Sequence, residues 1–179
     1  NTDKKYFTIE EYKEKIKANQ TDKNDSLVAL YTNHADAQYS YIAQAHDKGY
    51  DVLVMDSTID NHYMQHLEYK GEKMVFKRVD ADTMDKLIEK DTSSESVLNK
   101  EEEEQLKKYF QEVVTTPTAT VELKALSPTD FPVLITKNEF MRRMQEMTRL
   151  SGGGNKMMDM DYFNLVVNTN HPLTAKLLK

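Results

Sequence analysis

The 179-residue chain contains neither cysteine nor tryptophan, only five glycines and four prolines, and no long apolar run. The absence of cysteine excludes disulfides and thiolate chemistry and is typical of a reducing compartment, so we expect a cytoplasmic location. A membrane-spanning helix needs about 20 largely apolar residues in succession. No stretch of the chain offers them, and we expect no membrane partner. The net charge of −6 lacks the basic excess of nucleic-acid-binding proteins, so we expect no nucleic-acid partner either.

The composition that remains, 39% hydrophobic and 30% charged residues, is typical of a globular protein with one domain or two small ones. The chain begins at Asn1 rather than at a methionine. It ends in residues 172–179, a helix-like segment without a terminating signal. We therefore expect a piece of a longer protein, whose function depends partly on residues outside this sequence.

The first half of the chain alternates short apolar segments with helical patterns. Thr8 and Glu11 have the spacing of a capping box, and Gly49 stands where a left-handed residue ends a helix. Strands of this kind that alternate with helices predict a small doubly wound α/β domain with a mostly parallel sheet. We expect strands at 27–31, 51–55 and 74–79, and helices at about 9–17, 35–48 and 59–69.

The second half has a different pattern. Residues 91–96 are polar and predict a linker, and a charged helix is expected at 101–114. Period-two alternation at 118–126 and 133–135 predicts two antiparallel strands joined through a turn. A further strand is expected at 162–167. For the entire chain we therefore expect an α/β part followed by an α+β part. The α+β part is a mixed module with antiparallel strands and an exposed amphipathic helix at 140–150.

That amphipathic helix lies in a region unusually rich in methionine. Six of the ten methionines fall between positions 141 and 160. Methionine is flexible and polarizable, so a cluster of it can adapt to many apolar partners. The same spacing is also typical of a helix packed into a core. A surface for apolar partners and a purely structural helix are therefore both possible from the residues alone.

Three other patterns resemble sites for metals or cofactors. His62 and His66 share one helix face and could hold a metal with Asp56 or Asp60, but a solvated helix face is the preferred explanation. Residues 151–156 contain three glycines before a lysine, with the wrong spacing for a phosphate loop. The turns expected after the first two strands contain no glycine that would let a backbone approach a pyrophosphate, which disfavours dinucleotide binding. A nucleophile elbow is absent from the sequence.

Several segments, taken in order, resemble the heat-shock protein 90 family of molecular chaperones, especially its bacterial HtpG type. These segments are residues 6–12, 49–60, the 140–150 helix, and the motif Asn-Thr-Asn-His-Pro-Leu at 168–173. The resemblance implies that residues 1–93 form the last α/β part of the family's middle domain. It implies equally that 94–179 form the start of the C-terminal domain, without the dimerisation helices.

The resemblance also implies a function. The ATPase site, with its ATP and Mg, lies elsewhere in such a protein, so this fragment needs no cofactor, binds no metal and is not itself an enzyme. The partners are unfolded client proteins, and the full-length protein is a homodimer. The expected client-binding residues are Phe140, Met141, Met144, Met147, Leu150, Met157 and Met158, with Arg142, Arg143 and Arg149 at the wet edge of the surface. The alternative is a flavodoxin-like nucleotide- or cofactor-binding enzyme domain.

Overall fold

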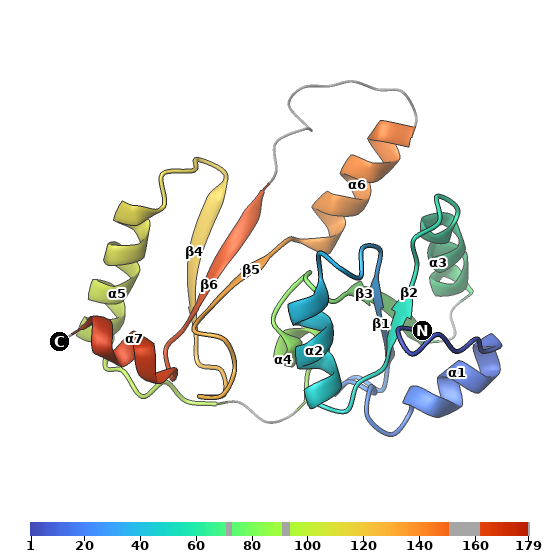
Figure 1. The fold of residues 1–179 in the computed structure, drawn as a ribbon, viewed down its shortest axis with the longest axis horizontal. Helices are drawn as coiled ribbons and strands as arrows, with labels where there is room; N and C mark the ends of the chain where they lie inside the picture. Colours follow the sequence, from blue (N-terminus) through green and yellow to red (C-terminus); the bar gives the residue numbers. More distant parts are fainter. Residues whose placement is uncertain (71–72, 91–93, 151–161, 179) are drawn as a thin grey trace. The chain divides into compact units, whose positions relative to one another are not determined.

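The computed structural model describes residues 1–70, 73–90, 94–150 and 162–178, and the side chains of 146, 147, 149 and 150 lie outside that description. The chain divides into two compact units, Asn1–Asp91 and Thr92–Lys179. Each unit contains one three-stranded sheet with helices packed on it (Figure 1). The expected order, an α/β part followed by an α+β part, is confirmed.

The first unit is built on a fully parallel sheet in the order β2-β1-β3. Because successive side chains of a strand point to opposite faces, the central strand supplies both cores. Val28 and Leu30 pack with α2 and α4, whereas Ala29 and Tyr31 pack with α1 and α3. The sheet is therefore doubly wound. Its elements are α1 (Ile9–Ile16), β1 (Leu27–Thr32), α2 (Tyr39–Asp47), β2 (Val52–Val54), α3 (Asp60–Tyr69), β3 (Met74–Arg78) and α4 (Met84–Leu87).

Local signals position the helices of this unit. The Thr8 and Glu11 side chains form the predicted capping box at the start of α1. Gly49 ends the α2 segment at a φ of 74°, a conformation that glycine adopts without steric cost. α2 begins at Tyr39 rather than at residue 35 because Gln38 turns back toward β1, where its Oε1 accepts from the Thr32 hydroxyl at 2.5 Å.

The second unit contains a mixed sheet in the order β4-β6-β5. β4 runs parallel to β6, and β5 runs antiparallel to it. The strands predicted at 118–126 and 133–135 run in opposite directions, as expected, but they are not neighbours, because β6 lies between them. A period-two pattern specifies which face of a strand is buried and does not specify the neighbouring strand. The elements are α5 (Lys100–Val113), β4 (Ala119–Lys124), β5 (Val133–Thr136), α6 (Glu139–Leu150), β6 (Phe163–Asn168) and α7 (Pro172–Leu177).

One face of this sheet packs against α5. Leu106 of α5 is fully buried against Val121 of β4 and Val167 of β6. Asn99 and Glu102 form a second capping box, which fixes the start of α5 and leaves its acidic first turn in a favourable position relative to the helix dipole. The acidic run of α5 therefore has a structural explanation.

Candidate functional site

The methionine-containing helix α6 starts at a well-defined cap. The Asn138 Oδ1 accepts hydrogen bonds from the backbone N–H groups of Phe140 and Met141, at 3.1 and 3.2 Å. The Asn138 carbonyl accepts the first helical bond, from Arg142 N, at 3.1 Å. Asparagine at this position satisfies amides that the helix itself cannot, and it fixes where the helix begins.

The apolar side chains at the start of α6 are exposed. Phe140 is 68% exposed, Met141 41% and Met144 38%. Phe140 and Met144 stand four residues apart, so they occupy adjacent turns on the same side of the helix. An amphipathic helix normally turns its apolar side toward the core. Within the described side chains of α6, the apolar residues instead face outward.

The charged residues of α6 explain this orientation. Arg142 projects from the side of the helix away from Phe140 and Met144, and its side chain is only 6% exposed. Its Nη2 donates to the Glu139 carboxylate at 2.7 Å, and Arg143 Nε donates to the same oxygen at 2.7 Å. A guanidinium tolerates burial when a carboxylate and hydrogen bonds compensate its charge.

Arg142 therefore differs from our expectation that its head would be wet at the edge of an apolar surface. The sequence does contain the signal for this arrangement, since Glu139 precedes the two arginines by three and four residues, the spacing at which helical side chains meet. Spacing alone does not say which side of the helix is turned toward the protein. Four of the predicted surface residues cannot be compared with the structure. It does not describe the side chains of Met147 and Leu150, and Met157 and Met158 lie outside the described residues.

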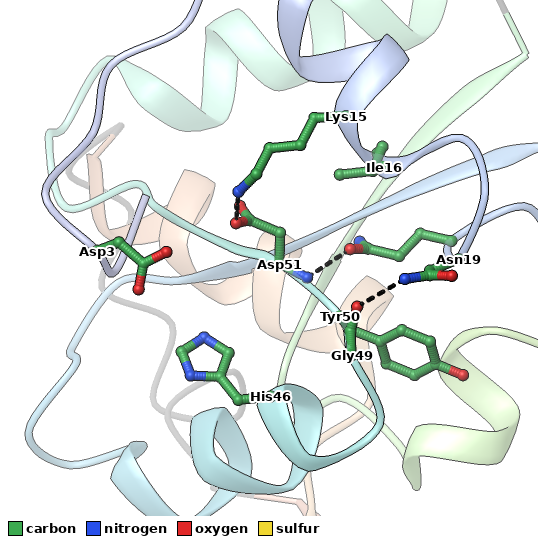
Figure 2. Close-up of a pocket in the computed structure, with 9 residues that line it drawn as sticks. Asp3, Lys15, Ile16, Asn19, His46, Gly49, Tyr50 and Asp51 are labelled. Carbon is green, nitrogen blue, oxygen red and sulfur yellow. Dashed lines mark hydrogen bonds and ion pairs between the residues drawn. The ribbon is translucent and has the colours of Figure 1, made fainter.

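A polar cavity of about 300 Å³ in the first unit is a second candidate (Figure 2). Asp51 pairs with Lys15 across it, and Gln20 Oε1 accepts from the Asp51 amide at 2.6 Å. Asn19 Nδ2 donates to the Gly49 carbonyl at 3.1 Å. These contacts tie the end of α1 to the turn between α2 and β2. The cavity wall is thus a structural clamp, in which polar side chains satisfy backbone groups that would otherwise be buried unpaired.

The carboxyl ends of the parallel strands, where α/β proteins often bind ligands, do not fit a nucleotide phosphate. A phosphate site needs backbone N–H groups that are free to donate. Here the Asn33 amide donates to Gln38 at 3.3 Å, the His34 amide to Thr32 at 3.3 Å, and the Ser57 amide to Asp60 at 2.9 Å. These donors serve the protein's own turns.

His62 and His66 lie on α3, as predicted. Across the described residues, no three histidine, aspartate or glutamate side chains come together in a way that would hold a metal ion. In the same part of the chain, every helix is too short or too polar to cross a membrane.

The Asn-Thr-Asn-His-Pro-Leu motif has a structural role. Asn168 is fully buried, and its side chain accepts from the amides of Leu126 and Asn170 and donates to the Ser127 carbonyl. Asn170 accepts from Val97 N at 2.8 Å and donates to the Glu95 carbonyl at 3.0 Å.

The rest of the motif starts the last helix. His171 caps α7 through Nδ1, which accepts from the Leu173 amide at 3.1 Å, and Pro172 is the first residue of that helix. Proline suits this position because its missing N–H would have no helical partner. The motif thus clamps the loop after β4, the segment before α5 and the helix α7 around the end of β6.

These features define a two-unit module, in which a doubly wound parallel unit is followed by a mixed unit that carries this clamp and a helix with exposed apolar side chains. A family model described as "Hsp90 protein" matches residues 1–179. The chain belongs to this family.

Relatives from bacteria agree with this assignment. The chain is 42% identical over 181 residues to "Chaperone protein htpG" of Bacteroides fragilis strain YCH46 and 41% identical to the protein of that name from Bacteroides thetaiotaomicron. It is 38% identical to that of Porphyromonas gingivalis ATCC 33277. The alignments cover 96–99% of this chain but only 26–27% of the relatives, so the chain spans about a quarter of their length. The family does not favour the flavodoxin-like alternative.

Proposed function

We propose that this chain is a non-catalytic part of a molecular chaperone and that α6 supplies one wall of a surface for unfolded or partly folded client proteins. The observation that carries the proposal is the inverted orientation of α6, with Phe140, Met141 and Met144 exposed and Arg142 buried behind them. Keeping apolar side chains in water has no benefit for folding, because burial would stabilise the protein. Exposed apolar surface of this kind is typical of an interaction site.

The chemistry of the exposed side chains fits a client surface of low sequence specificity. Methionine side chains repack easily around different apolar groups, and Phe140 provides a rigid aromatic contact beside them. Such a surface binds by reversible burial of apolar area, from which the ordering of flexible side chains must be subtracted. Modest, exchangeable affinity follows. The proposed set extends to Met147, Leu150, Met157 and Met158.

The wider assignment is also a proposal. Residues 1–93 correspond to the end of the middle domain and residues 94–179 to the start of the C-terminal domain of a cytoplasmic, homodimeric, ATP-dependent protein. ATP and Mg bind outside this chain, which is consistent with the occupied amides at the ends of β1 and β2. Isothermal titration of the chain with ATP tests this point, because tight stoichiometric binding would contradict it.

Client binding is tested with a permanently unfolded protein, reduced and carboxymethylated α-lactalbumin carrying a fluorescent label. Fully burying a phenylalanine contributes about 1.5–3 kcal/mol, so covering the exposed two-thirds of Phe140 contributes about 1–2 kcal/mol. We expect Phe140→Ser to weaken binding by about 5- to 30-fold in fluorescence anisotropy.

Tyr69→Ser is the matched control, because Tyr69 is a 93% exposed aromatic residue on α3 of the first unit. We expect this control to bind the client as tightly as the wild-type chain. Equal effects of the two substitutions, or no effect of Phe140→Ser, would remove α6 from the client surface.

A further inference from the structure

Among the methionines whose side chains the structure describes, two are exposed, three are buried and Met55 is intermediate. Met141 and Met144 on α6 are 41% and 38% exposed, whereas Met64, Met74 and Met84 in the first unit are 1%, 3% and 5% exposed. The chain has no cysteine. Methionine sulfur is therefore the group in this chain that a mild oxidant attacks most readily, and access to the sulfur decides which methionines react.

We propose that Met141 and Met144 are a reversible oxidation site at which hydroperoxides regulate the apolar surface of α6. The sulfur lone pair attacks one oxygen of the peroxide, the O–O bond breaks and an S–O bond forms. The attacked oxygen gives its proton to the departing oxygen, which leaves as water from hydrogen peroxide or as an alcohol from an organic hydroperoxide. Sulfur loses two electrons, the peroxide gains them, and the product is methionine sulfoxide.

The chemical change is large at this position. A sulfoxide is polar and accepts hydrogen bonds, so it loses little by staying in water and much by being covered by an apolar client. The fold should tolerate the change, because both side chains already lie at the surface and the cap and the Glu139 ion pairs that hold α6 contain no sulfur. Oxidation would weaken client binding without unfolding the helix.

Reversal requires a methionine sulfoxide reductase and two thiols. The sulfoxide oxygen then leaves as water, the thiols become a disulfide, and the thioether returns. The exposure that admits peroxide also admits such an enzyme to both residues. The loss of client affinity rests on the proposed function of α6, whereas the selectivity of oxidation does not.

The experiment treats the 179-residue chain with hydrogen peroxide and follows each methionine by peptide mass spectrometry. We expect Met141 and Met144 to be oxidised at least about tenfold faster than Met64 and Met74. Oxidation rates for Met141 and Met144 equal to those of Met64 and Met74 would overturn the inference. That result would not affect the proposal that the non-oxidised α6 binds clients.

The second arm measures binding of the labelled unfolded α-lactalbumin before and after peroxide. We expect affinity to fall at least about threefold and to return after treatment with both epimer-specific reductases and dithiothreitol. The double variant Met141→Leu/Met144→Leu, compared with its own untreated sample, should not respond to peroxide. A response of similar size in that variant would assign the effect to other methionines and overturn the inference. Selective oxidation that leaves affinity unchanged in the wild-type chain would overturn the regulatory role.

Discussion

Removing the charge of Glu139 should destabilise α6 more than removing the charge of its buried partner. Glu139→Gln leaves Arg142, 6% exposed, and Arg143, 16% exposed, without the carboxylate that both contact at 2.7 Å. Removing one partner from a buried charge costs up to about 3–5 kcal/mol, and both the further interactions of the two arginines and the 21% exposure of Glu139 offset part of this loss. We expect a cost of about 2 kcal/mol.

Arg142→Met should cost less than about 1 kcal/mol, because the methionine fills much of the same volume and Glu139 keeps Arg143 as a partner. This inequality is the central test. A helix held in place by apolar packing alone would show the reverse order, since the longer arginine side chain makes more contacts than the glutamate.

Hydrogen exchange by mass spectrometry is the suitable assay, because it reports on residues 139–145 separately from the first unit. A loss of about 2 kcal/mol corresponds to roughly thirtyfold faster exchange when opening is reversible. Glu104→Gln, in the exposed part of α5, is the matched control and should change exchange in α6 by less than about 0.5 kcal/mol. The reasoning would be refuted if Glu139→Gln changed exchange in α6 by less than about 0.5 kcal/mol, or if exchange were faster in Arg142→Met than in Glu139→Gln.

Three further predictions concern the fold. Gly49→Ala should lower the free energy of unfolding by about 1 kcal/mol, measured by urea unfolding. The cause is backbone strain at a φ of +74°, because an added Cβ would meet no atom closer than Asn19 Nδ2 at 3.6 Å. An unchanged free energy of unfolding would contradict this. Burial, aided by Asp51, raises the pKa of Tyr12, so the contribution of Tyr12 to stability should be constant below about pH 10 and fall above it, as this tyrosine ionises in the unfolded chain. Above about pH 10, the urea midpoint of Tyr12→Phe should fall less steeply with pH than that of the wild-type chain. An equally steep fall in both proteins would contradict this prediction. Asn168→Ala should destabilise the second unit by about 2–4 kcal/mol, measured by hydrogen exchange of residues 124–127. Asn168→Asp should have an effect between those of the wild-type chain and Asn168→Ala.

Features that depend on neighbouring residues could be predicted from the sequence. The capping box at Thr8 and the left-handed Gly49 are confirmed because their geometry involves contacts within a few residues. The parallel sheet of the first unit is confirmed because helices between strands require crossovers. The one-turn helix Met84–Leu87 was missed, since four residues are too few to establish a helical period.

Features that depend on distant parts of the chain could not be predicted. The insertion of β6 between β4 and β5 depends on residues 163–168, which carry the same kind of apolar pattern as the strands they separate. The burial of Arg142 depends on which side of α6 faces the protein, and amphipathic spacing is the same in either orientation. The motif at 168–173 could be recognised as a resemblance, but the contacts of Asn168 with Leu126 and Ser127 became evident only from the fold.

The central position of β6 in the second sheet has a consequence for the order of folding during synthesis. The first sheet is complete once Arg78 has been made, because β1 pairs with both of its neighbours. In the second sheet, neither β4 nor β5 can form its pairing until β6, which ends at Asn168, has been synthesised. Chain synthesis proceeds at about 5–20 residues per second, so these two strands keep unpaired edges for several seconds after they are made. During that interval a protein whose relatives are named chaperones itself presents open strand edges to its surroundings.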